Sequence, residues 1–67
     1  MISYRKLWVL IASKGLEKKY LKEVIGLDQT IYSKLNSDKY VSLKTLEKIA
    51  EHFKVDIGDI IEIKKER

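Results

Sequence analysis

Residues 23–35 read EVIGLDQTIYSKL, and this stretch decides the fold. Gly26 is placed to end a helix, since glycine adopts a positive φ without steric cost. Asp28, two residues later, is suited to accept hydrogen bonds from the free amides at the start of a new helix. Leu27 lies between them and is predicted to enter the core. The spacing therefore predicts two helices that meet at a sharp turn, a helix-turn-helix over about residues 17–36.

Apolar residues at helical spacing place further helices on both sides of this turn. Ser42 precedes the clearest amphipathic pattern of the chain and Asp56 precedes a last turn or two, so both are predicted caps. The alternation Ile61-Glu62-Ile63-Lys64 is typical of an extended tail. We predict one domain over residues 1–67 with an all-α, five-helix fold that runs into this tail. The predicted helices cover about residues 3–14, 17–25, 28–36, 42–53 and 56–61.

Composition restricts the chain to one small domain. It has 67 residues, with no cysteine and no proline, and a chain of this length buries only about 60% of its unfolded surface. The absence of cysteine fits a reducing compartment. The apolar run Leu7–Ala12 is shorter than the core of a signal peptide and far shorter than the ~20 residues that span a bilayer. A cytoplasmic protein outside the membrane is therefore predicted.

The positive charge is concentrated in the half of the chain that contains the turn. Residues 1–40 carry eight basic and four acidic side chains, whereas residues 41–67 carry six of each. The whole net charge of +4 therefore belongs to the first half. A surface that faces nucleic-acid phosphates requires such one-sided charge, although ordinary small domains also carry a few surplus lysines.

Catalytic and metal-binding chemistry have little support in the sequence. His52 is the single histidine, and the pattern places no second ligand beside it. The carboxylates are spread among lysines and helix caps, so no acid–base pair is indicated. The aromatic residues are predicted to pack helices rather than to stack on bases. We expect no enzyme activity, no cofactor, no metal and no small-molecule ligand.

The pattern as a whole resembles the Cro and lambda-repressor-like (XRE) helix-turn-helix regulators, including very short bacterial members. The similarity covers about residues 3–62, and it depends on a set of positions in one register rather than on any single residue. The resemblance implies that the helix after the turn enters the major groove of DNA, which is about 12 Å wide. The positions that carry it are Leu16, Leu21, Gly26, Leu27, Leu35, Val41, Ser42, Leu43, Leu46, Ile49, Ala50, Val55, Asp56, Ile57, Gly58, Asp59 and Ile60.

The resemblance also implies which side chains contact DNA. Gln29 stands where relatives read a base edge, and its amide both donates and accepts, which suits adenine. Lys34 is placed to reach guanine acceptors or a phosphate, and Lys18 occupies the position of a glutamine that clamps the DNA backbone in relatives. Residues near the following loop are expected to contact phosphates. The predicted set is Lys18, Lys19, Asp28, Gln29, Thr30, Ser33, Lys34, Ser37, Lys39, Tyr40 and Lys44.

Four residues depart from the family pattern. Lys22 replaces a small alanine where the two helices cross, Tyr32 replaces an aliphatic core residue, and Glu17 replaces a Ser or Thr cap. We expect the methylenes of Lys22 to lie against Tyr32, with the ammonium in solvent or over the ring. Ile31 is more apolar than its counterpart in relatives, so it packs on Lys22, contacts a thymine methyl, or marks a helix reused for protein binding.

The resemblance implies a transcriptional repressor that binds double-stranded DNA. One copy covers little DNA, so a homodimer on half-sites about 34 Å apart is expected. The main alternative is an adaptor or anti-regulator that keeps the fold but binds protein. Ile31, Tyr32 and acidic Asp28 favour this alternative. RNA binding is a further alternative.

Isoleucines near the C-terminus supply the expected dimer interface. Ile57, Ile60 and Ile61 fit a helical face, which leaves Ile63 as surplus apolar surface. An extended segment there would pair either with its twin across a two-fold axis or with Met1-Ile2-Ser3. A frayed terminus with one exposed isoleucine is the remaining alternative.

Overall fold

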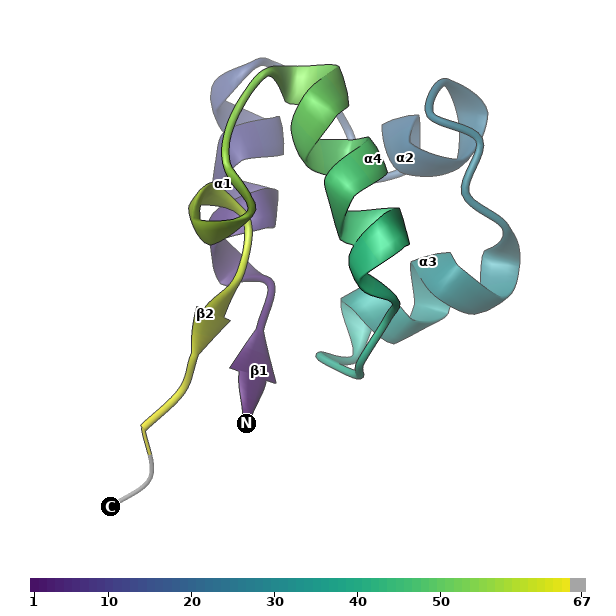
Figure 1. Ribbon diagram of the computed structural model, residues 1–67. Coiled ribbons are helices and arrows are strands. Elements are labelled where there is room, and N and C mark those ends of the chain that lie inside the picture. Colours follow the sequence, from purple (N-terminus) through teal and green to yellow (C-terminus); the bar gives the residue numbers. More distant parts are fainter. Residues whose placement is uncertain (66–67) are drawn as a thin grey trace.

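Four α-helices, one 3₁₀ turn and two short strands make up residues 1–65, the part of the chain that the computed structural model describes. Figure 1 shows α4 in the middle of the molecule, with α1 on one side of it and α2 and α3 on the other. The fold is mostly helical, as predicted, but it has four helices rather than five and a small sheet joins its ends. The elements are β1 (Ile2–Ser3), α1 (Arg5–Ser13), α2 (Tyr20–Glu23), α3 (Gln29–Asn36), α4 (Leu43–Phe53), η1 (Ile57–Asp59) and β2 (Glu62–Ile63).

The fifth predicted helix is a single 3₁₀ turn, η1, because the chain leaves the helical path almost at once. The carbonyl of Ile57 accepts hydrogen bonds from the N–H groups of Ile60, at 3.0 Å, and Ile61, at 3.1 Å, which completes one turn. Ile60 then enters the core with no exposed surface, and Glu62 begins β2. The sequence prediction was wrong here because core packing and strand pairing outweigh the local helical signal.

The turn between α2 and α3 depends on the backbone of Gly26. This residue has a φ of +89°, and the N–H of Leu27 donates back across the turn to the carbonyl of Leu21 at 3.0 Å. Leu27 is buried, as predicted. A Cβ on Gly26 would meet no heavy atom within 4 Å. The left-handed backbone angle, and not crowding, therefore favours glycine at this position.

Helix α2 is shorter than the predicted range 17–25 because its first turn is of the 3₁₀ type. The N–H groups of Tyr20, Leu21 and Lys22 each donate to the carbonyl three residues earlier, and bonds to the fourth residue back begin with Glu23. Lys19, the N-cap residue before the helix, makes no capping hydrogen bond with its side chain. The free amides are satisfied by 3₁₀ bonds instead.

The predicted caps of α3 and α4 are confirmed. An Asp28 carboxylate oxygen accepts from the N–H of Ile31 at 2.9 Å, and the Ser42 hydroxyl oxygen accepts from the N–H of Thr45 at 3.1 Å. Each cap satisfies a backbone donor that the helix itself leaves free. Helix α4 ends at Lys54, which takes a left-handed φ of +59° without being glycine.

The core lies between the four helices and is closed by residues from both ends of the chain. Leu35 supplies the buried side of α3, and Ile60 enters from the segment after η1. A fully buried aromatic ring, that of Tyr4, keeps its hydroxyl hydrogen-bonded to the carbonyl of Lys39 at 2.7 Å. Burial raises the pKa of this hydroxyl above its ordinary value. The largest fully buried side chains are Tyr4, Leu7, Ile11, Leu21, Leu35, Ile49 and Ile60.

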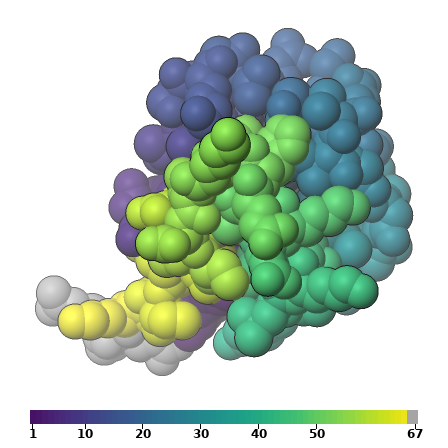
Figure 2. Space-filling model, turned by 45° about the horizontal axis from the view of Figure 1, so that its top comes forward, coloured from purple at the N-terminus to yellow at the C-terminus, as the bar shows by residue number. Residues whose placement is uncertain are grey.

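The extended tail pairs with the start of the chain, which confirms one of the two predicted pairings. Strands β1 and β2 are antiparallel, with Ile2 opposite Ile63 and Ser3 opposite Glu62. The N–H of Lys64 donates to the carbonyl of Met1 at 2.7 Å. In Figure 2 the residues drawn in yellow, near the end of the described chain, lie beside the purple first residues. The two strands thus join the ends of the described chain.

Asp38, in the loop between α3 and α4, connects three separate segments. Its carboxylate accepts from the N–H of Tyr4 at 3.0 Å and from the Lys64 ammonium at 3.2 Å. The backbone of Asp38 has a φ of +56°, in the left-handed region that aspartate and asparagine tolerate better than most residues. The residue therefore ties the loop after α3 both to the start of α1 and to the tail.

Asp38→Asn is expected to lower the melting temperature near neutral pH and to have less effect in acid. The Tyr4 N–H and the Lys64 ammonium hold the pKa of the Asp38 carboxyl below its ordinary value. A lowered folded-state pKa gives stability that is present above the unfolded pKa, about 3.9, and is lost as pH falls through the folded pKa. Melting curves of parent and variant should therefore converge below about pH 4. Glu47→Gln, on the exposed side of α4, is the control. A gap of equal size at pH 2 and pH 6 would assign the loss to geometry rather than to charge.

Candidate nucleic-acid interface

Six of the eleven predicted contact residues lie together along the outer face of α3 and the loop that follows it. Leu35 is buried on the opposite side of this helix, so the residues about half a turn away face solvent. A shallow groove along this face and the following loop is lined by Gln29, Thr30, Ser33, Lys34, Ser37 and Lys39. All of them are exposed. The groove combines hydrogen-bonding side chains with two lysines, which is the chemistry that base edges and phosphates require.

Gln29 is held by hydrogen bonds on both sides of its amide. Its Nε2 donates to the hydroxyl of Ser33 at 3.0 Å, one helical turn along α3. Its Oε1 accepts from the ammonium of Lys22, on α2, at 2.6 Å. The sequence analysis placed Gln29 on this face but did not foresee the bond from Lys22. The signal was present, because a lysine at the crossing of the two helices is within reach of the first turn of α3.

Lysines of α2 and of the turn before it line the neighbouring edge of α3. The Lys22 ammonium lies 5.4 Å from the centre of the Tyr32 ring, so the predicted contact between these two residues is confirmed. Lys18 lies 4.5 Å from the centre of the Trp8 ring and donates to the Asn36 side-chain oxygen at 3.3 Å. Both lysines remain exposed, with their charges beside the outer face of α3.

Lys19 and the loop after α3 supply further exposed side chains. Lys19 is paired with Glu17 at 3.4 Å, and both are largely solvated, so this ion pair adds little to stability. Lys39 and Tyr40 follow Asp38, and 72% of the Tyr40 surface is exposed. The hydroxyl of buried Tyr4 donates a hydrogen bond to the carbonyl of Lys39. The loop therefore presents its side chains from an anchored backbone.

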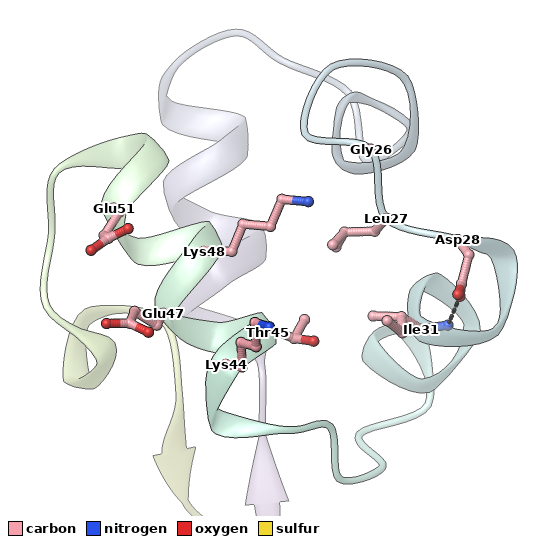
Figure 3. A pocket seen from close by; sticks show the side chains of 9 residues that line it. All are labelled: Gly26, Leu27, Asp28, Ile31, Lys44, Thr45, Glu47, Lys48 and Glu51. Carbon is pink, nitrogen blue, oxygen red and sulfur yellow. Dashed lines mark hydrogen bonds between the residues drawn. The ribbon is translucent and has the colours of Figure 1, made fainter.

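Asp28, the residue before α3, and Lys44, on α4, lie apart from this groove. Both line a depression with Leu27 and Ile31, and Figure 3 shows Leu27 and Ile31 pointing into the space in front of α4. The dashed bond in that view is the cap from Asp28 to the N–H of Ile31. The structure therefore places these two predicted contact residues on a different surface from the groove.

The isoleucines of the predicted dimer interface have different environments. Ile60 is fully buried in the core, so its side chain is not available to a partner. Ile57 and Ile61 are half-buried, and Ile63 has 69% of its surface exposed. Within the predicted interface, Ile63 is the residue with substantial apolar surface to offer.

The single histidine belongs to an aromatic cluster at the other end of α4. The Tyr20 hydroxyl and the Nε2 atom of His52 are 2.6 Å apart, and Phe53 packs against both rings. Among residues 1–65 no group of three His, Cys, Asp or Glu side chains is placed to hold a metal ion. None of the helices in this range has both the length and the hydropathy to cross a membrane.

Comparison with known proteins relates this geometry to one family. A model of the Cro/C1-type helix-turn-helix DNA-binding domain matches residues 6–66. A crystal structure of the transcriptional regulator VanUg is similar, with a TM-score of 0.91 and 38% sequence identity over 97% of this chain and 87% of that chain. No curated protein sequence gives a match.

Proposed function

Because this chain belongs to the family of Cro/C1-type helix-turn-helix DNA-binding domains, we propose that it binds double-stranded DNA sequence-specifically, with α3 in the major groove. Its structural neighbour VanUg is a transcriptional regulator, and we propose the same role here, in the cytoplasm. Repression is the mode that needs the fewest parts, because a protein that occupies an operator blocks other proteins from the same DNA.

The outer face of α3 is the observation that carries this proposal. Gln29, Thr30 and Ser33 offer hydrogen-bonding groups at the start of the helix. Lys34 and Lys39 lie beside them on the C-terminal side, and lysines of the α2 region flank them on the other. Polar side chains with lysines on both sides suit a helix in the major groove. The polar groups would contact base edges, and the lysines would contact phosphates.

Binding of a random short duplex at increasing salt tests the proposal. Each phosphate that a lysine neutralises contributes about −0.9 to the slope of log affinity against log salt. Three or four such contacts from one protomer predict a slope of about −3 or steeper. Absence of binding even at low salt would overturn the proposal.

Lys18→Ala is expected to weaken binding to all duplexes alike and to make the salt slope shallower by about one unit. Lys18 lies beside the end of α3, and the proposal assigns its charge to a phosphate of the DNA backbone. Lys14→Ala is the matched control, because Lys14 is an exposed lysine at the C-terminal end of α1. Slopes can be measured by fluorescence anisotropy. An unchanged slope for Lys18→Ala would remove this residue from the interface.

Protein binding is the second candidate function, and the depression between α3 and α4 favours it. Its floor includes Leu27 and Ile31, while Lys48 and Glu51 of α4 stand at its rim. Leu43, at the start of α4, also has 71% of its surface exposed. A chain that binds no DNA in the salt experiment would use this surface instead.

We further propose a homodimer whose protomers meet along β2. A two-stranded sheet leaves one edge of each strand free, and two β2 strands related by a two-fold axis would form a continuous sheet. Ile63, exposed at this edge, would then find an apolar partner. Two reading helices would recover the affinity that a single small domain lacks.

Ile63→Asp is expected to turn the dimer into a monomer, because two carboxylates would then be buried in the same interface. Sedimentation velocity of the parent and the variant measures this directly. Val24→Asp is the control, since Val24 is an exposed apolar residue at the end of α2, 57% exposed. A variant that stays as dimeric as the parent would exclude β2 and favour the surface near the loop between α3 and α4.

A further inference from the structure

The hydrogen bond between Lys22 and Gln29 has a chemical consequence for base recognition. The Lys22 ammonium has three donors and no acceptor, so it bonds only to the oxygen of the Gln29 amide. The Ser33 hydroxyl, on the other side, either accepts or donates and would bond to either end of that amide. Lys22 therefore determines which of its two orientations, with Oε1 and Nε2 exchanged, the Gln29 amide adopts.

The position of Lys22 is itself restricted. Its ammonium lies 5.4 Å from the centre of the Tyr32 ring, where the cation is attracted to the ring face. Tyr32 is half-buried on α3, one helical turn from Gln29. The lysine thus contacts α3 at two points, and its donor is directed at the first turn of that helix.

In this arrangement Gln29 keeps one free lone pair on Oε1 and one free N–H on Nε2. Adenine presents an N6 donor and an N7 acceptor in the major groove, and these match the free acceptor and the free donor of the Gln29 amide. Guanine presents two acceptors, N7 and O6, and the single free donor of the Gln29 amide does not match both. We infer that Lys22 is a positioning residue that locks the Gln29 amide in the orientation that selects adenine over guanine. This inference rests on the proposed function.

Without Lys22, the amide is free to turn over. Its Oε1 would then accept from the Ser33 hydroxyl, and both N–H groups of Nε2 would be released toward the groove. Two donors match guanine, so the preference for adenine would fall. Arginine also carries donors and no acceptor, so Lys22→Arg should keep the amide in its original orientation.

The test compares Lys22→Met with Lys22→Arg on an operator selected from random duplexes with the parent protein. The base pair read by Gln29 is the one whose preference disappears in Gln29→Ala, and it is then exchanged from A·T to G·C. The parent and Lys22→Arg should prefer adenine by about five- to 150-fold, the range that one good bidentate pair supplies. Lys22→Met, which keeps the apolar stem against Tyr32, should bring this ratio close to one.

Two further measurements separate positioning from simple charge. In a Gln29→Ala background, Lys22→Met should leave base preference unchanged, because no amide remains to be positioned. In the free protein, Lys22→Met should shift the side-chain amide signals of Gln29 in a ¹⁵N correlation spectrum, while Lys22→Arg restores them toward the parent position.

The failures are distinguishable. If the parent binds no duplex at low salt, the proposed function fails and the inference fails with it. If the parent selects an operator, but Lys22→Met weakens every duplex equally and keeps the adenine-to-guanine ratio, then Lys22 is a phosphate contact. In that case the inference is wrong and the proposed function stands.

Discussion

Leu35→Ala is expected to lower the free energy of unfolding by about 2–5 kcal/mol. Leu35 has no exposed surface and joins α3 to the core, so its loss removes buried apolar surface and leaves a cavity. A domain of fewer than about 70 residues rarely gains more than 3–5 kcal/mol from its core, so this one change removes most of the margin. Denaturant titration followed by circular dichroism gives the free energy, and the melting temperature should fall by roughly 10 °C or more.

Leu43→Ala provides the matched control for this prediction. It makes the same chemical change at the first residue of α4, where 71% of the leucine is exposed. Its effect should stay within about 0.5 kcal/mol, as for most surface substitutions. Equal losses at the two positions would contradict the packing of α3 against the core.

Gln29→Ala is expected to reduce preference for the best operator over random duplex by about 1–3 kcal/mol, with non-specific binding nearly unchanged. The reason is that non-specific affinity depends on phosphate contacts, to which a neutral amide adds little. Competition of the selected operator against random duplex, at one fixed salt concentration, measures this difference.

Thr30→Ala, at the adjacent exposed position of α3, is the comparison, and it should change the preference by less. If Gln29→Ala instead weakened operator and random DNA by the same factor, Gln29 would be a backbone contact. The assignment of base readout would then move to Ser33 or Lys34, which share the groove with Gln29.

Local signals in the sequence predicted the centre of the fold well. The left-handed turn at Gly26 and the caps at Asp28 and Ser42 are each determined by residues a few positions apart. Their chemistry constrains the backbone directly, whatever packs around it. The outer face of α3 followed from the same local register, because the burial of Leu35 fixes which side chains point outward.

Features that depend on distant parts of the chain were harder to predict. The turn η1 is short because Ile60 packs into the core and Glu62 pairs with Ser3, at the opposite end of the chain. Asp38 holds the N–H of Tyr4, to which no local pattern connects it. The left-handed end of α4 at Lys54 carries no glycine to signal it. The helical propensity of a segment gives no information about these long-range contacts.

In the candidate site, too, local features were predicted more fully than contacts between separate elements. Side chains on a single helix, such as Gln29 and Ser33, were predicted to share a face. The bond from Lys22 to Gln29 crosses between two helices, and it depends on how closely they approach. Asp28 and Lys44 were predicted to contact DNA from their positions along the chain, whereas the structure places them in the depression before α4.

We expect the pairing of β1 with β2 to form late in the folding of this chain. Bringing Ile2 beside Ile63 closes a loop that spans nearly all of the described residues, at an entropic cost of roughly 3–4 kcal/mol. The few hydrogen bonds of two-residue strands, worth about 0.5–1.5 kcal/mol each, cannot meet that cost before the core exists. Contacts between α2 and α3 are close in sequence and form at little cost. We therefore expect α2 and α3 to assemble early and the terminal sheet last. In the folded protein the sheet should then open more readily than the contact between α2 and α3.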